Sequence, residues 1–111
     1  MPLMVGQGVL GRVRFKDGQM PQYDRTYLIV AIDADYIKVL NVSTIKGKER
    51  KLAFPYNERL RVYCPPFRYP SFVKLDSLTK VPLKECGGLK VLHGGEPLDA
   101  TELNRILQFL S

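Results

Sequence analysis

The sequence has few of the residues and motifs on which most enzymes depend. Its 111 residues include one histidine and two cysteines, and they contain no CxxC pair, no phosphate-cradling glycine-rich loop and no serine in a nucleophile elbow. Cys64 and Cys86 have no histidine at ligand spacing, which argues against a zinc site and favours two reduced thiols. We therefore expect no metal and no cofactor, and any catalysis must proceed without a pair of imidazoles.

Long apolar segments are also lacking. No stretch approaches the roughly 20 uninterrupted apolar residues that cross a bilayer, and the N-terminus lacks the charged start and apolar run of a signal peptide. We expect a cytoplasmic protein without a membrane partner. The length and the hydrophobic content of 45% suit one compact core, so residues 1–111 are predicted to form a single domain.

Positive charge is in excess and is unevenly distributed. Seventeen Lys and Arg residues against eleven Asp and Glu residues give a net charge of +6, which favours a polyanionic partner. One segment after an apolar run contains four cations, Lys46, Lys48, Arg50 and Lys51. We interpret these four as contacts to RNA phosphates, and the alternative is a solvated hairpin loop. The loop residue Tyr23 is a candidate for base stacking, although such residues more often pack over the end of a barrel.

Short apolar runs rich in Val, Ile, Tyr and Phe, separated by Gly, Pro, Asn or Asp, predict β-structure. The predicted strands are residues 12–16, 26–32, 36–42, 50–54, 71–75 and 78–81. The second and third of these are expected to pair as a hairpin at the centre of the sheet, with both faces buried over part of their length. The proline-rich segment 64–70 cannot continue a sheet ladder and is predicted to be an extended loop.

The C-terminal segment changes to a helical period. Its apolar residues are Leu103, Ile106, Leu107 and Leu110, which is the spacing of an amphipathic helix face. Asp99 and Glu102 have the spacing of a capping box, so the helix is predicted to begin at Ala100 with both side chains capping it. A mainly-β fold follows, a small and partly open barrel with a C-terminal α-helix. This fold serves many functions and decides none of them.

Polar residues stand at the predicted strand ends. Arg25 precedes one strand, Ser43 and Thr44 end the next, and Lys74 and Asp76 lie where another finishes. On one rim, such groups can cleave RNA through its own 2′-OH: Asp76 accepts the hydroxyl proton, Arg25 binds the phosphate and Thr44 donates a hydrogen bond. From the chemistry alone, ordinary surface residues that pair with one another remain the favoured alternative.

The order of these segments resembles that of the MazF/PemK family of toxin ribonucleases. The resemblance runs from about Gly8 to Leu110 and is carried by the alternating segment 11–16, Arg25 with the following TYLIV, VLNVST at 39–44, SFVKLDSLTKVPL at 71–83 and the terminal helix. It implies an SH3-like barrel, a homodimer and a metal-independent endoribonuclease of a bacterial toxin–antitoxin system. Such an enzyme cuts single-stranded RNA and leaves 2′,3′-cyclic phosphate and 5′-hydroxyl ends, and a cognate antitoxin protein occupies its RNA groove.

The resemblance also implies roles for particular residues. The catalytic arginine of the family matches Arg25, although Thr26 replaces the usual proline after it. The hydroxyl that ends the next strand matches Thr44, or Ser43 if the register slips by one residue. The general base matches Asp76, and Lys74 stands where some members have a proton-donating arginine, so the charge is kept and the planar fork is lost. The loop 16–24 lacks the Gly-Ser-Glu-Gln pattern of the family.

Two other functions fit the same fold class. A CcdB-like toxin poisons DNA gyrase through protein contacts and needs no catalytic residues. A noncatalytic barrel can bind nucleic acid through the basic segment alone. The combination of Arg25, Thr44 and Asp76 favours the ribonuclease over both.

Overall fold

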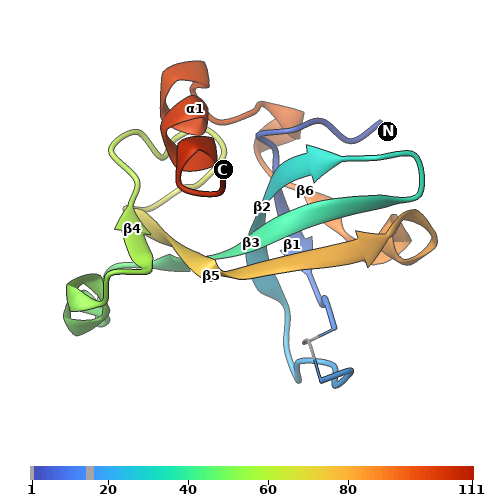
Figure 1. Cartoon of the computed structure of the whole chain (residues 1–111), viewed down its shortest axis with the longest axis horizontal. Coiled ribbons are helices and arrows are strands. Elements are labelled where there is room, and N and C mark those ends of the chain that lie inside the picture. Colours follow the sequence, from blue (N-terminus) through green and yellow to red (C-terminus); the bar gives the residue numbers. More distant parts are fainter. Residues whose placement is uncertain (1, 15–16) are drawn as a thin grey trace.

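A computed structural model describes residues 2–14 and 17–111 of the chain. Within these residues six strands form one antiparallel sheet in the order β4-β5-β3-β2-β1-β6 (Figure 1). The strands are β1 (Gly8–Gly11), β2 (Arg25–Ile32), β3 (Tyr36–Thr44), β4 (Asn57–Arg59), β5 (Ser71–Pro82) and β6 (Lys90–Val91). A single α-helix of the described chain, α1 (Ala100–Gln108), follows the last strand. The predicted mainly-β fold with a C-terminal helix is confirmed, and the sheet is open because β4 and β6 form its two edges.

The hairpin of β2 and β3 lies at the centre of the sheet, as predicted, and is buried on both faces. Alternate residues point to opposite faces of a strand, so each strand supplies two hydrophobic clusters. The first face carries Leu28, Val30, Leu40 and Val42, which pack with Leu98 and with Ile106 of α1. The second face carries Tyr27, Ile29, Ile37 and Val39, which pack with Val9, Val13 and Val81. This double burial explains the continuous apolar runs in the sequence.

Helix α1 begins at Ala100, as its pattern predicts, and its cap is partly different from the prediction. Asp99 accepts a hydrogen bond from the backbone N–H of Glu102 at 3.0 Å. The Glu102 carboxylate does not return to the N-cap amide. It accepts hydrogen bonds from Arg105 and from the backbone N–H groups of Arg61 and Val62, which follow β4. A guanidinium and two backbone donors outcompete one N-cap amide, and the helix is thereby fastened to the sheet edge.

Two predicted strands are wrong. Residues 50–54 form most of a 3-10 helix, η1 (Glu49–Ala53), because the backbone makes local bonds from Lys51 N to Lys48 O (2.9 Å) and from Phe54 N to Lys51 O (3.2 Å). The strand predicted at 12–16 lies earlier, at Gly8–Gly11. Its partner β2 begins at Arg25, opposite Gly11, so no partner remains for the following residues. Residues 15 and 16 lie outside the described part of the chain.

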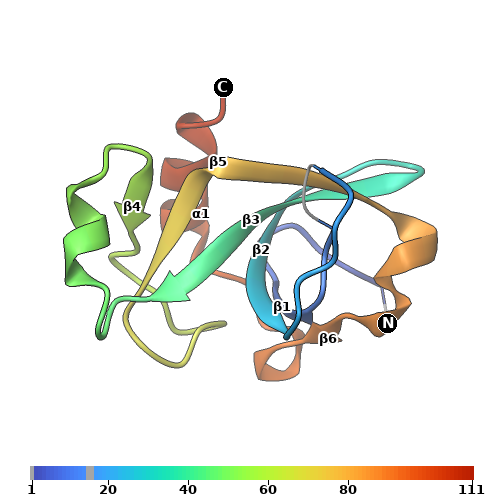
Figure 2. The same ribbon diagram turned by 90° about the horizontal axis from the view of Figure 1, so that it is seen from below.

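The ends of the sheet differ in what surrounds them. Figure 2 shows β4 and η1 at one end, the 3-10 helix η2 (Leu83–Gly88) at the other, and β5 running between them. The proline-rich segment 64–70 lies outside the sheet, as predicted, but residues 64–66 form a turn rather than extended chain, closed by a hydrogen bond from Phe67 N–H to Tyr63 O at 2.8 Å. The Phe67 side chain is buried in the first-face cluster. Across residues 2–14 and 17–111, no helix has the length and apolar character required to cross a bilayer.

Candidate functional site

A bulge in β5 carries two of the predicted site residues. Lys74 pairs with Asn41 of β3, and the next ladder pair on β5 is at Thr79, so residues 75–78 lie opposite a single β3 residue. Ser77 holds this bulge together: its hydroxyl donates to Lys74 O at 2.6 Å and accepts from Asn41 N at 2.8 Å. The strand predicted to finish near Asp76 therefore continues to Pro82, and the predicted strands 71–75 and 78–81 are one. Bulges of this kind re-aim side chains next to functional sites.

Beside the bulge lies a cavity of about 250 Å³, the Lys74 cavity. Its lining residues are Val13, Arg14, Arg25, Tyr27, Asn41, Lys74, Asp76, Ser77 and Thr79. Arg25, Lys74 and Asp76 were all predicted from the sequence as catalytic residues. Tyr27 and Asn41 are cross-strand partners and bring β2 and β3 residues of the second face to this point. The structure thus brings together a guanidinium, an ammonium and a carboxylate from two strands distant in sequence.

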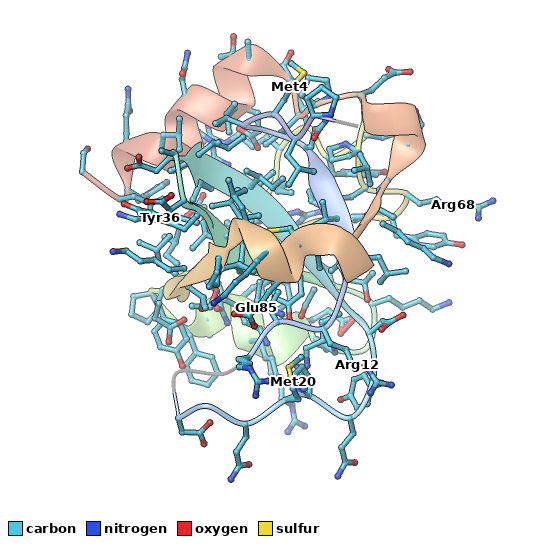
Figure 3. The ribbon with its side chains drawn as sticks, turned by 90° about the vertical axis from the view of Figure 1, so that its right-hand side faces the viewer. Met4, Arg12, Met20, Tyr36, Arg68 and Glu85 are labelled. Atoms are coloured by element: carbon cyan, nitrogen blue, oxygen red, sulfur yellow. The ribbon has the colours of Figure 1, made fainter. Side chains whose placement is uncertain are left out.

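The other two predicted catalytic residues, Ser43 and Thr44, line a different cavity. This Thr44 cavity has a volume of about 530 Å³, and Thr26, Cys64, Arg68, Tyr69 and His93 are also among its lining residues. The consecutive residues Arg25 and Thr26 line the two cavities, so both lie at the same end of the hairpin. The expected gathering of all five residues at one site is therefore divided in two. Figure 3 shows Arg68 extending away from the protein at this edge.

His93 is exposed, and its backbone φ of 53° is in the left-handed region, the one such non-glycine residue in the described chain. It begins the short 3-10 helix η3 (His93–Gly95). Within residues 2–14 and 17–111, no group of three or more His, Cys, Asp or Glu side chains has an arrangement that could hold a metal ion.

Like charges converge on Lys74. Burial lowers the pKa of this half-buried side chain most strongly, repulsion from Lys51, Lys48 and Arg25 lowers it further, and only Asp76 opposes the shift. A cation whose pKa is lowered by burial and by specific charged neighbours in a cavity is a marker of functional sites. The site accordingly favours the arrival of negative charge.

Tyr23 positions the guanidinium of Arg25. Arg25 lies over the Tyr23 ring at 5.1 Å from its centroid, and its Nη2 donates to the Tyr23 hydroxyl at 3.4 Å. The Tyr23 side chain is 63% exposed, so it does not pack over the end of the sheet, and its surface remains accessible for the predicted base contact. Tyr27, which lines the Lys74 cavity with Arg25, is buried, and burial raises the pKa of its phenol.

The predicted RNA-binding segment adjoins this site. Lys46, Lys48, Arg50 and Lys51 are all exposed. Lys51 lines a small cavity of about 190 Å³, the Lys51 cavity, which shares Lys74 and Asp76 with the Lys74 cavity. Arg25 is shared in turn with a hollow of about 320 Å³ under residues 19–23. Shared lining residues thus link the three cavities: Lys74 and Asp76 join one pair, and Arg25 joins the other.

Sequence reasoning missed several residues of the site. Asn41 is a polar residue inside an otherwise apolar stretch, VLNVS, and that interruption was the available signal. Ser77 contributes by holding the β5 bulge together, and no local sequence pattern predicts a bulge. The gap between the strands predicted at 71–75 and 78–81 nevertheless includes Ser77. Phe54 and Tyr56 line the Lys51 cavity and were missed: Phe54 falls in the strand predicted at 50–54, and Tyr56 was assigned to no element.

A comparison with protein-family models gives no match for this sequence, and a comparison with curated proteins gives none either. The function is therefore inferred from the geometry of the site and from the resemblance of its sequence motifs.

Proposed function

We propose that this protein is a metal-independent endoribonuclease of the MazF/PemK type that cuts single-stranded RNA. The observation that carries this proposal is that Arg25, Lys74 and Asp76 line one cavity beside a group of exposed cations. The proposal includes the further properties of that type: an SH3-like arrangement of the sheet, a cytoplasmic location, a homodimer and inhibition by a cognate antitoxin protein.

The proposed reaction needs no nucleophile from the protein. The 2′-oxygen of the RNA attacks the adjacent phosphorus, its proton passes to the Asp76 carboxylate, and the bond from phosphorus to the 5′-oxygen breaks. Arg25 donates hydrogen bonds to the non-bridging oxygens, where negative charge increases in the transition state. The products are a 2′,3′-cyclic phosphate and a 5′-hydroxyl.

Lys74 is proposed as the proton donor to the leaving 5′-oxygen. An ordinary lysine is a weak acid, with a pKa near 10.5, and the lowered pKa of Lys74 makes its ammonium a stronger one. This compensates for the absence of an arginine at this position, because proton transfer requires acidity rather than a planar fork. At low RNA concentration, where the rate reports kcat/KM, cutting should slow as the pH rises through the pKa of Lys74 in the free protein, since the proton to be donated is then lost.

Ser43 and Thr44 have a supporting role in this proposal. Because they line a cavity other than that of Arg25, we propose that their hydroxyls contact a neighbouring nucleotide rather than the reacting phosphate. This assignment differs from a direct catalytic role for Thr44, and substitution separates the two. Thr44→Val keeps the shape of the side chain and removes its hydroxyl.

The experiment that tests the function is cleavage of a long single-stranded RNA in EDTA, with mapping of the product ends. The wild type is expected to make discrete cuts with cyclic phosphate ends. Arg25→Ala should reduce cutting at least 100-fold, as loss of an oxyanion donor does. Thr44→Val should reduce it less than fivefold, about the effect of one lost neutral hydrogen bond.

The control is Lys84→Ala, which removes an exposed cation of η2 at the other end of the sheet (Figure 2). It should cut like the wild type. Intact RNA after incubation with folded wild-type protein, over several RNA sequences, would contradict the proposal and favour a gyrase-directed toxin. RNA that is bound and left intact would instead favour a noncatalytic nucleic-acid-binding module.

A further inference from the structure

Two aromatic side chains lie stacked and exposed beside the Lys74 cavity. The ring centroids of Phe54 and Tyr56 are 5.5 Å apart, and the ring planes differ by 3°. The two residues are 47% and 42% exposed. We refer to this pair as the aromatic shelf. Exposed ring faces next to cations are the surface on which the bases of single-stranded nucleic acids stack.

The backbone beneath the shelf is fixed at both ends. Phe54 N–H donates to Lys51 O at 3.2 Å, and the Phe54 carbonyl accepts from Asn57 N–H at 3.0 Å. The Tyr56 carbonyl accepts from Leu75 N–H of the β5 bulge at 2.7 Å. Pro55, which lies between Phe54 and Tyr56 in the sequence, restricts the backbone further. The rings are therefore presented in place before a ligand arrives, which lowers the entropy lost on binding.

The shelf forms one wall of the Lys51 cavity. The other lining residues are Lys51, Asn57, Lys74 and Asp76, and the last two also line the Lys74 cavity. Asn57 is 8% exposed; its Nδ2 donates to Lys51 O at 2.9 Å, and its Oδ1 accepts no hydrogen bond from the part of the chain that the structure describes. The Oδ1 atom is itself buried, so what the cavity offers a ligand is stacking surface and positive charge.

We propose that the aromatic shelf binds a nucleobase of single-stranded RNA, that of a nucleotide adjoining the phosphate held in the Lys74 cavity. This inference rests on the proposed function and extends it to a base-binding subsite. The base stacks on an exposed ring, and Lys51 contacts the attached phosphate. An RNA is favoured over an apolar protein segment because Lys48, Lys51 and Lys74 all bear positive charge on this side.

The test is a binding measurement that does not depend on cleavage. The probe is a short fluorescent single-stranded RNA in which every 2′-hydroxyl is replaced by fluorine, so that it cannot attack its own phosphate. Fluorescence anisotropy gives the Kd for each variant. Phe54→Ala and Tyr56→Ala should each weaken binding by about tenfold, which is within the range for one lost base stack. Tyr56→Phe keeps the ring and should bind like the wild type.

The matched control is Phe109→Ala, which removes a phenylalanine that is 51% exposed, directly follows α1 and lines none of the Lys74, Thr44 and Lys51 cavities. It should change the Kd less than twofold. An abasic version of the probe supplies the complementary control, because it keeps the phosphates and removes the bases. On this probe the shelf variants and the wild type should bind with equal affinity.

The outcomes separate this inference from the proposed function. Unchanged affinity of Phe54→Ala and Tyr56→Ala for the base-containing probe would contradict base binding by the aromatic shelf. This result is expected if the two rings contact a protein instead. If those variants lose affinity while the wild type fails to cut ordinary RNA, base binding by the aromatic shelf is supported and the proposed ribonuclease activity is contradicted. If the wild type cuts RNA and the shelf variants bind normally, only the shelf is overturned.

Discussion

Two clusters of charged residues in this protein follow opposite electrostatic rules. Around Arg105, opposite charges meet: its Nε lies 2.7 Å from Glu102 Oε1 and its Nη1 lies 2.5 Å from Glu58 Oε2. Around Lys74, like charges meet, with Lys51, Lys48 and Arg25 all repelling its ammonium. The first cluster satisfies its charges within the protein and fastens α1 to β4. The second leaves a positive potential that a phosphate can neutralise.

The pKa values show the same contrast. The hydrogen bond from Arg105 is the largest cause that lowers the pKa of Glu102, and the backbone donors Arg61 and Val62 add to it. The charged forms of both partners are thereby stabilised. Lys74, in contrast, has its charged form destabilised by burial and by its neighbours. The ion pairs around Arg105 stabilise the fold. The repulsion between cations around Lys74 marks a candidate binding site for an anion.

The largest expected effect comes from removing the proposed general base and acid of the Lys74 cluster. Asp76→Asn and Lys74→Met should each slow RNA cutting by about 10² to 10⁴-fold, the usual contribution of a general base or acid. Single-turnover cleavage measures the rate. A substrate with sulfur at the bridging 5′ position separates the roles, because its leaving group needs no proton. Lys74→Met should regain most of its rate on this substrate, and Asp76→Asn should not.

Neither substitution should lower stability by more than about 0.5 kcal/mol, since partly exposed residues outside the core rarely do. Equal rescue of both variants by the sulfur substrate would contradict the assignment of acid and base.

The paired cluster should respond in the opposite way. Glu102→Ala leaves the charge of Arg105 without its main partner and should lower the free energy of unfolding by about 3 kcal/mol, as loss of one member of a buried ion pair does. Urea denaturation measures this effect. The rate of cutting per folded molecule should not change. Glu96→Ala, which removes an exposed carboxylate, is the control and should leave stability within about 0.5 kcal/mol.

The same cluster predicts a dependence of stability on pH. The pKa of Glu102 is lowered below its ordinary value of 4.5 in the folded protein. Its contribution is therefore complete above the unfolded pKa and is lost as the pH falls through the lower folded value. Urea midpoints measured from pH 6 downward should fall below about pH 4.5 in the wild type. The part of this decrease in urea midpoint that is due to Glu102 should be absent in Glu102→Ala. Parallel curves of urea midpoint against pH for the two proteins would rule out the contribution of Glu102.

The smallest effect expected is that of the exposed cations around Lys74. Lys51→Ala should weaken RNA binding by a few-fold and reduce the slope of log K against log salt by about 0.7, the value for one phosphate contact with a single strand. Lys84→Ala removes an exposed lysine of η2, at the other end of the sheet, and should leave the slope unchanged (Figure 2). Identical slopes for both variants would place the RNA elsewhere.

Much of the scaffold follows from the sequence. The central hairpin was predictable because both of its faces are buried, which requires the apolar runs at 26–32 and 36–42. The start of α1 was predictable because Asp99 accepts the expected backbone hydrogen bond. The 3-10 helix at Glu49–Ala53 was not, because its bonds are local and its five residues are too few to show a period.

The candidate site was predictable only in part. Arg25, Lys74 and Asp76 were selected as polar residues at strand ends, and the structure brings them to one cavity. The separation of Thr44 from them depends on strand register and on the β5 bulge. Both are set by long-range pairing and by the hydrogen bonds of Ser77, which no short pattern encodes.

The most direct test of the account is the pKa of Lys74, measured by NMR titration of its side chain with and without the non-cleavable RNA probe. The account predicts a value below 10.5 in the free protein and a rise when RNA binds, because the phosphate stabilises the ammonium. Lys84 should titrate identically in both samples. An ordinary pKa for Lys74 that RNA leaves unchanged would contradict the claim that this cavity receives the phosphate.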